Sequence, residues 1–332
     1  MAVKILEPTE KNIDDVADHL RQGGLAAIPT ETVYGLAADA TNDRAVARIF
    51  EAKGRPSFNP LIVHYNSKED AESAVIFNSQ AELLASLFWP GPLTLILPRR
   101  PDTPVSLLTS AGLPSQAVRC PQHPVARALI DKLGHPVAAP SANRSGSLSP
   151  TTPQHVLGSL GDAAEIILAG GKCDVGLEST VVDLTGDVPT LLRPGAITAD
   201  DLKMHLGDLR IETEAVDHNP KSPGQLLKHY APNTPLRLRA VDVMPGEALL
   251  AFGSTRFMGI RGGGHAKDLS DDTCLNLSAT GDLNEAAANL FSMLHRLDAG
   301  GFQSIAVMDI PNTGLGVAIN DRLVRAAGAQ KS

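Results

Sequence analysis

The chain has 332 residues, of which 43% are hydrophobic and 20% charged, and its formal net charge is -8. This length exceeds the size at which a single hydrophobic core usually stops growing, so we expect a globular protein with two domains. The negative net charge argues against nucleic-acid binding through a broad basic surface, but it leaves room for a local basic cleft.

The cysteines and the apolar segments indicate a cytoplasmic protein. Cys120, Cys173 and Cys274 are far apart and lack the C-x-x-C spacing of metal or redox pairs, which suits a reducing compartment. The N-terminal segment carries acidic residues and no apolar core of a secretion signal. The longest apolar stretch without a charge, residues 83–98, is interrupted by Pro-Gly-Pro and is too short to span a bilayer. We therefore expect no membrane-spanning segment.

Short strands alternate with helices over the first two thirds of the chain. Helices are predicted where apolar residues recur at helical spacing, and strands where short apolar or β-branched runs occur. The predicted helices are residues 10–21, 81–88, 123–133 and 152–160, with another ending at Gly54. The predicted strands are residues 25–28, 61–64, 93–97, 117–120, 137–139, 166–168, 180–183 and 191–193. This alternation predicts an α/β domain with a mixed, twisted sheet that ends near residue 209.

The stretch from Lys53 to His64 carries two cations and a histidine. A helix is expected to end at Gly54, a residue that tolerates positive φ, and two prolines prevent its continuation. Taken alone, the stretch is better explained by Lys53 complementing the negative helix end and by Arg55 as a solvated loop charge. His64 would end the following strand, where a lone histidine is more often packed in the core than catalytic.

Two polar segments follow predicted strands directly. Residues 30–36 place two hydroxyls and a carboxylate after the strand 25–28, where α/β proteins usually hold ligands. Residues 141–151 follow the strand 137–139 and combine small hydroxyl and amide side chains with glycine, which can cradle phosphate or ribose. The first segment could equally cap a helix, and the second could be a flexible loop.

Four cations, Lys53, Arg55, Arg119 and Arg193, are each predicted near the end of a helix or strand. If they converge, they would bind a polyphosphate or a carboxylate, because arginine offers a planar fork and lysine a compact charge. The sequence contains no G-x-S-x-G elbow, no H-E-x-x-H and no Cys-His pairing by spacing. We therefore expect neither a covalent nucleophile nor a tightly held metal.

The remainder of the chain predicts a linker and a second domain. Residues 210–235 are polar and rich in Pro and Gly, which is typical of a linker. The adjacent His229 and Tyr230 could stack on a ligand and form hydrogen bonds, so a lid and a passive spacer are about equally consistent with this composition. Beyond it, strands at 248–252 and 303–310 and helices at 284–299 and 320–327 predict a smaller α/β, Rossmann-like domain. The expected domains are residues 1–209, a linker or lid at 210–235, and residues 236–332.

The order of the motifs resembles a known family. PTETVYGL, KGRP with NPL and LIVH, AVR, PSANRSG with SPT, ESTVVD and LRPG stand in the order of the YrdC-like domain. SPG, HYAP, GLG and NDRL look like the linker and C-terminal domain of the Sua5 proteins. The similarity extends from about Leu6 to Ala327, so the chain resembles the two-domain threonylcarbamoyl-AMP synthases.

The resemblance implies a nucleotidyltransferase that converts L-threonine, bicarbonate or CO2, and ATP into threonylcarbamoyl-AMP and pyrophosphate. The product would serve the N6-threonylcarbamoyl modification of tRNA through a downstream tRNA threonylcarbamoyl transferase. Mg2+ is expected to enter with the ATP phosphates, without a tightly bound organic cofactor. Because the substrates supply their own nucleophiles, the enzyme would act by positioning and charge stabilisation. Whether tRNA binds directly is left open.

The resemblance also assigns the site residues. The threonine pocket would consist of Thr32, His64, Arg119, Ala139 and Ser179. The ATP side would consist of Lys53, Arg55, Asn59, Ser115, Ser141, Asn143, Ser149, Arg193 and Tyr230. Within it, the family's KxR and SxN tetrad corresponds to Lys53, Arg55, Ser141 and Asn143, and Tyr230 would reach over the nucleotide as part of a mobile lid. The linker reads GQLLKHYAP, which departs from the family's usual basic and aromatic middle.

Two other functions use a YrdC-like domain. One is an RNA-binding, translation-associated module, which the negative net charge disfavours. The other is carbamoyl transfer of the hydrogenase-maturation type, which expects zinc-finger and acylphosphatase segments that this sequence does not show.

Overall fold

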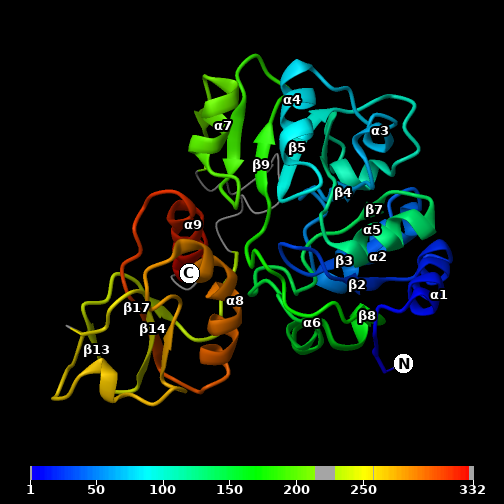
Figure 1. The fold of residues 1–332 in the computed structure, drawn as a ribbon. Coiled ribbons are helices and arrows are strands. Elements are labelled where there is room, and N and C mark those ends of the chain that lie inside the picture. The colour runs from blue at the N-terminus through cyan, green and yellow to red at the C-terminus, as the bar shows by residue number, and fades with distance from the viewer. Residues whose placement is uncertain (1, 214–228, 257, 329–332) are drawn as a thin grey trace. The chain divides into compact units, whose positions relative to one another are not determined.

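A computed structural model of the chain describes residues 2–213, 229–256 and 258–328. The described residues form two compact units (Figure 1). The first contains residues 2–145, 149–174 and 178–213, and the second contains residues 146–148, 175–177 and the described chain from 229. Most of the predicted linker, 210–235, lies outside the described residues, so the three domain boundaries stay a prediction. No helix in the described ranges is long and apolar enough to cross a membrane.

The first unit alternates helices and short strands. Its helices are α1 (Glu10–Arg21), α2 (Asp43–Lys53), α3 (Lys68–Ala71), α4 (Ser79–Phe88), α5 (Pro124–Leu133), α6 (Pro153–Leu160) and α7 (Ala199–Leu206), with 3-10 turns η1 (Leu107–Ser110) and η2 (Gly161–Ala164). Its strands are β1 (Lys4–Leu6), β2 (Ala26–Ile28), β3 (Gly35–Asp39), β4 (Ile62–His64), β5 (Leu93–Pro98), β6 (Ser115–Arg119), β7 (Val137–Ala138), β8 (Ile166–Leu168), β9 (Thr180–Asp183), β10 (Thr190–Arg193) and β11 (Arg210–Ile211).

The strands of the described part of this unit pair into one eleven-stranded sheet in the order β1-β8-β2-β3-β7-β4-β6-β5-β9-β10-β11. The sheet is mixed, since β4 runs parallel to β6 but antiparallel to β7, and β5 runs parallel to β9 but antiparallel to β6. The predicted fold class, a mixed sheet with helices, is confirmed.

Helices pack on both faces of this sheet. Apolar residues of α2, α4, α6 and α7 join one core cluster, together with the strand residues Ala27, Leu36 and Val63. Apolar residues of α1 and α5 join a second cluster with Ala26 and Ala37. Because successive strand residues point to opposite faces, the two clusters lie on opposite faces of the sheet.

Several elements of the first unit were not predicted, among them β3 and α7. The strand β3 has the sequence GLAAD, which lacks the β-branched and aromatic residues typical of strands, yet all five of its residues are buried. The helix α7 is preceded by Thr198, whose hydroxyl accepts from Asp201 N while the Asp201 carboxylate accepts from Thr198 N. This capping box is a helix-start signal that the sequence does contain.

The second unit contains a small parallel sheet. Strands β12 (Leu236–Arg237), β17 (Ser304–Val307), β14 (Glu247–Ala251) and β16 (Cys274–Asn276) pair in that order, each parallel to its neighbours, and β13 (Asp242–Val243) pairs with β15 (Gly259–Ile260). The helices are α8 (Leu283–Asp298) and α9 (Leu315–Gly328), with a 3-10 turn η3 (Ala266–Asp268). The predicted second α/β domain is confirmed as a fold, although α9 begins earlier than the predicted residue 320.

The end of α2 provides a direct test of the local sequence argument. Gly54 follows Lys53 with φ of 60° in the left-handed region, and nothing would lie within 4 Å of an added Cβ. Gly54→Ala should therefore lower the free energy of unfolding by about 1 kcal/mol through backbone strain alone. Urea denaturation measures this change.

Gly158 in α6 serves as the matched control, because it is also exposed with nothing within 4 Å but lies inside a helix without positive φ. Gly158→Ala should be neutral or stabilise by up to about 1 kcal/mol. If the two substitutions shift stability in the same direction, the assignment of Gly54 as a conformational cap is wrong.

Candidate active site

Several residues predicted to bind the substrate threonine lie on one face of the central strands. His64 of β4 and Arg119 of β6 are paired in register on adjacent parallel strands. The residues two positions earlier, Ile62 and Ala117, belong to a small buried cluster with Ile96, Val181 and Leu192. Since side chains alternate between faces, His64, Arg119, Thr94 and Ser179 lie on the same face as this cluster. We call this surface of β4, β6, β5 and β9 the site face.

Helices α1 and α5 cover the adjoining part of the same face. Val137 of β7 pairs with His64 and belongs to the core cluster formed with α1 and α5. Ala139, predicted as a wall of the threonine pocket, belongs to that cluster too, and its backbone N–H donates to Ile62 O (3.1 Å). Ala139 therefore lies at the border between the helix-covered part and the site face.

Arg119 contacts Thr32, another residue predicted to bind threonine. Its side chain is 3% exposed, and Nη1 donates to Thr32 Oγ1 (2.9 Å) while Nε donates to Gly91 O (3.1 Å). Thr32 follows β2 in the turn that leads to β3, and its hydroxyl lies 2.8 Å from Thr30 Oγ1. The structure thus brings Thr32 and Arg119 together, as the predicted pocket requires.

The Arg119 guanidinium also forms an ion pair with Glu31, a residue to which the sequence assigned no role. Nη2 donates to Glu31 Oε1, and Glu31 Oε2 accepts from Gln122 N (3.1 Å). Burial alone would raise the pKa of Glu31, but the charge and hydrogen bond of Arg119 hold that pKa below its usual value. The signal available in the sequence was a carboxylate between two threonines, directly after a buried strand.

Ser179 joins the two predicted substrate sides. Thr94 Oγ1 lies 2.7 Å from Ser179 Oγ, and Arg193 Nη2 donates to the same oxygen (3.0 Å) while Arg193 Nε donates to Ser179 O (2.9 Å). Ser179 was predicted for threonine and Arg193 for ATP. Their direct contact places the two predicted binding regions side by side on the sheet. Thr94, a single hydroxyl within an apolar strand, was not predicted.

Lys53 binds the segment of the predicted SxN motif. Its Nζ donates to Ser141 O and to Asn143 O, and its own carbonyl accepts from Ser145 N (2.8 Å). Burial, and then the charge of Arg55, hold the pKa of Lys53 well below its ordinary value. No carboxylate pairs with Lys53 in the described part of the chain. An incoming phosphate would therefore stabilise its charged form.

Arg55 and Asn59 face each other across the loop after α2. Arg55 Nε donates to Asn59 O (3.2 Å) and Nη2 to Pro60 O (2.8 Å). Asn59 is 1% exposed, and within the described residues neither its side-chain oxygen nor its side-chain nitrogen has a hydrogen-bond partner. Leaving a buried polar group unpaired costs about 1–3 kcal/mol, so this amide indicates a place for a ligand.

The other residues of the first unit predicted for ATP are Ser115, Asn143 and Ser149. Ser149 is fully buried and donates to Glu178 Oε1, and Asn143 Nδ2 donates to Arg144 O (2.9 Å). Ser115 begins β6, at the opposite end of the strand from Arg119, and pairs with Pro98. The structure does not connect Ser115 to the Arg119 network through any hydrogen bond among the described residues.

Tyr230 belongs to the second unit. It is 1% exposed with φ of 64°, and its ring centroid lies 4.0 Å from that of His229 and 5.8 Å from that of Phe291. The guanidinium of Arg322 stacks on the ring at 5.1 Å. The next residue, Ala231, donates its N–H to Gly146 O (2.8 Å). The contact of Tyr230 with a nucleotide stays a prediction.

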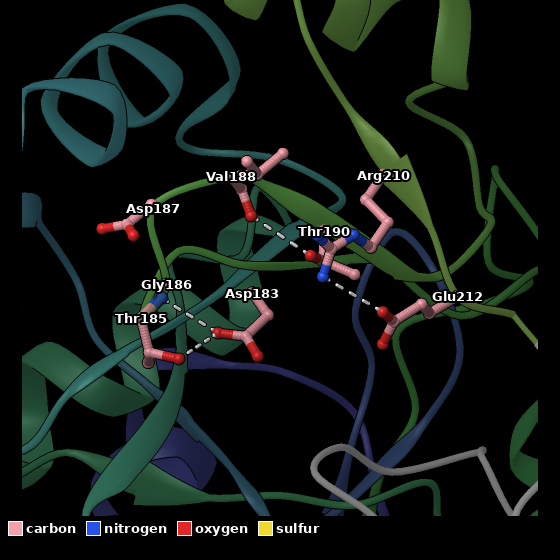
Figure 2. A pocket seen from close by; sticks show the side chains of 8 residues that line it. All are labelled: Asp183, Thr185, Gly186, Asp187, Val188, Thr190, Arg210 and Glu212. Carbon is pink, nitrogen blue, oxygen red and sulfur yellow. Dashed lines mark hydrogen bonds and ion pairs between the residues drawn. The ribbon is translucent and has the colours of Figure 1, made fainter.

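A separate pocket of about 310 Å3 lies at the turn between β9 and β10 and beside β11 (Figure 2). Asp183 faces this pocket, but its Oδ1 accepts from Thr185 N (2.9 Å) and from the Thr185 hydroxyl (2.6 Å). No predicted site residue lines it. In the described ranges, no group of three or more His, Cys, Asp or Glu side chains is arranged to hold a metal ion.

His64 contributes a neutral ring to the site face. It is 3% exposed, and within the described residues its Nδ1 has no hydrogen-bond partner. Burial, followed by the charge of Arg119, lowers the pKa of His64 to about 3. The ring is therefore uncharged at neutral pH and adds no positive charge beside Arg119.

This shift predicts a pH-dependent stability. Between the ordinary histidine value near 6.5 and the folded value of about 3, the unfolded state binds more protons, so stability falls as the pH drops through this window. His64→Gln should reduce the slope of unfolding free energy against pH by up to about 1.4 kcal/mol per pH unit. Urea titrations between pH 4.5 and 7 measure the slope.

The control is His205→Gln, at an exposed histidine of α7. An equal loss of slope in both variants would show that the effect does not come from the burial of His64.

Known proteins match the chain over nearly its whole length. Residues 18–195 match the domain family described as "Telomere recombination", and residues 197–328 match the threonylcarbamoyl-AMP synthase C-terminal domain. A protein of Bacillus subtilis and one of Pyrococcus abyssi, both named threonylcarbamoyl-AMP synthase, are each 40% identical. The alignments cover 98% of this chain and 95% of the Bacillus protein, and 96% of this chain and 95% of the Pyrococcus protein.

The fold matches a solved structure of the same kind. The crystal structure of P. abyssi Sua5 complexed with L-threonine superimposes with a TM-score of 0.86 at 36% identity, covering 99% of this chain and 98% of that one. Sequence motifs, domain matches and fold therefore agree over the two-domain chain. The protein belongs to the Sua5 family of threonylcarbamoyl-AMP synthases.

Proposed function

We propose that this protein is an L-threonylcarbamoyladenylate synthase, a nucleotidyltransferase that forms threonylcarbamoyl-AMP and pyrophosphate from L-threonine, bicarbonate or CO2, and ATP. The observation that carries the proposal is the contact of Arg193, expected on the ATP side, with Ser179, expected in the threonine pocket, because it joins the two predicted substrate sides. The names of the relatives, and the L-threonine in the P. abyssi complex, support the same substrates.

Arg119 binds the threonine carboxylate in this proposal. Of its five N–H groups, three donate to Gly91, Thr32 and Glu31, which leaves two without a partner among the described residues. A carboxylate is the ligand that a guanidinium fork binds best. The hydroxyls of Thr32 and Ser179 meet the remaining polar groups of threonine, with His64 and the Ala139 backbone as walls.

The nucleotide is held by the second set of residues. Lys53 and Arg55 bind the phosphates together with Arg193, and their buried positions strengthen each contact. The unpaired amide of Asn59 and the small polar side chains of the ATP side complete the site; they are Ser115, Ser141, Asn143 and Ser149. Tyr230 is proposed to contact the nucleotide as well, as the family resemblance implies.

The reaction needs no protein nucleophile. The threonine amine attacks CO2 and loses a proton to give a carbamate, whose oxygen then attacks the α-phosphorus of ATP as the bond to the pyrophosphate oxygen breaks. Lys53, Arg55 and Arg193 stabilise the charge on the phosphates during this displacement, while the Arg119 network holds the amino acid in place. Mg2+ is proposed to enter as part of the ATP substrate, bound through the phosphates.

The product is a mixed anhydride, so it requires rapid consumption by an acceptor. We propose a downstream tRNA threonylcarbamoyl transferase in the cytoplasm as the next step, leading to the N6-threonylcarbamoyl modification of tRNA. A cytoplasmic location agrees with three free cysteines in the chain.

An assay with labelled bicarbonate tests the activity. We expect label in an acid-labile nucleotide and release of pyrophosphate only when threonine and ATP are both present. Lys53→Ala should lower kcat/KM by about 100-fold or more, because one preorganised cation contributes on that order to charge stabilisation. Circular dichroism checks that the variant folds.

Lys203→Ala, at an exposed lysine of α7, is the matched control and should retain full activity. Threonine-independent labelling, or none, would rule out the proposed reaction. Tight, salt-dependent tRNA binding without turnover would instead favour the RNA-binding alternative.

A further inference from the structure

We propose that Glu31 is a positioning residue that fixes Arg119 and makes the threonine pocket electrically neutral, so that the pocket selects an amino acid over a carboxylic acid that lacks the amino group. This inference rests on the proposed function, since it concerns the residue expected to bind the threonine carboxylate. It assigns a role to a buried carboxylate that the proposed reaction does not otherwise use.

The hydrogen bonds of Glu31 hold Arg119 from two directions. One carboxylate oxygen accepts from Arg119 Nη2, and the other accepts from the backbone N–H of Gln122, three residues beyond Arg119. Arg119 Nη1 and Nε donate to Thr32 and Gly91. Each of the three guanidinium nitrogens therefore has one fixed partner, which sets the plane and rotation of the group. A substrate carboxylate can then use the two remaining N–H groups without reorganising the arginine.

The charges of these groups sum to zero. Glu31 is 5% exposed and Arg119 is 3% exposed, so water screens neither charge effectively. His64 beside them is uncharged at neutral pH, and Thr32 and Ser179 are neutral hydroxyl residues. Arg193, which contacts Ser179, is assigned to the phosphates. The pocket around Arg119 thus carries one positive and one negative group.

A pocket with one positive and one negative group is complementary to a zwitterionic ligand. The ammonium of a bound amino acid compensates Glu31 while its carboxylate binds Arg119, so no charge is left uncompensated in the buried site. A carboxylic acid without the amino group brings only its negative charge into a site that already contains Glu31. Repulsion of this kind discriminates against the wrong ligand more than it adds affinity for the right one.

Calorimetric titration of two ligands tests the inference. L-threonine and 3-hydroxybutanoate, which is threonine without its amino group, are titrated into the wild type and into Glu31→Gln. We expect the wild type to prefer threonine by about 100-fold or more, and the variant to reduce this preference by at least about 10-fold, because like-charge placement in a buried site costs several kcal/mol. An unchanged preference in Glu31→Gln overturns the inference, since a purely structural role would not depend on ligand charge.

Two further variants separate charge from folding. Glu31→Asp keeps the charge but shortens the side chain, so it should weaken threonine binding and retain the preference; loss of the preference would contradict the proposal. Glu247→Gln breaks a comparable ion pair with Arg237 in the second unit, where Glu247 is 8% exposed. It should leave the preference unchanged, and an equal reduction there would overturn the inference.

The outcome also separates this inference from the proposed function. A wild type that does not bind threonine refutes both. A wild type that binds threonine, with a preference that Glu31→Gln does not alter, refutes only the role of Glu31.

Discussion

The site depends on four buried cations that are held by backbone carbonyl groups. Lys53, Arg55, Arg119 and Arg193 are all less than 8% exposed, and each donates at least one hydrogen bond to a main-chain oxygen. Glu31 compensates the charge of Arg119, whereas the carbonyl dipoles around Lys53 orient that cation without cancelling its charge, and burial makes the charge costly. Such a centre is stabilised further when an anion binds. In the proposed function, the ATP phosphates and the threonine carboxylate are these anions.

The architecture explains how Arg119 and the pair of Arg193 and Ser179 come to lie on one region of the sheet from distant parts of the chain. Adjacent strands β4, β6, β5 and β9 place alternate side chains on one face, which also carries a small cluster of buried apolar residues. Helices α1 and α5 cover the neighbouring part of that face, and α2, α4, α6 and α7 cover the opposite face. The polar site therefore lies on a part of the sheet that these helices do not cover. Its walls come from the turn after β2 and the segment after β7.

The periodic elements could be predicted from the sequence because their signals are local. The helix 10–21 and the strands at β4, β5 and β6 follow from apolar spacing, and Gly54 ends α2 in the expected left-handed conformation. The strand β3 could not be predicted in this way, because its Gly and Ala residues form a strand only through pairing with β2 and β7. Tertiary burial overrides weak propensity there.

Only part of the candidate site could be predicted from the sequence. The family resemblance named Arg119, Thr32 and Ser179, and the structure brings Arg119 to Thr32 and Arg193 to Ser179. Local patterns favoured a helix-end role for Lys53, and they gave no role to Glu31, because a buried ion pair depends on contacts between residues 88 positions apart. The local pattern shows that a carboxylate follows a strand, but not which cation it meets.

A crystal structure with L-threonine and a nonhydrolysable ATP analogue tests most directly whether one sheet face holds both substrates. The account predicts that the threonine carboxylate accepts hydrogen bonds from the two remaining N–H groups of Arg119. It also predicts that Lys53 and Arg193 bind the ATP phosphates, with Ser179 between the two substrates. Threonine bound away from Arg119, or phosphates that contact neither Lys53 nor Arg193, would contradict it.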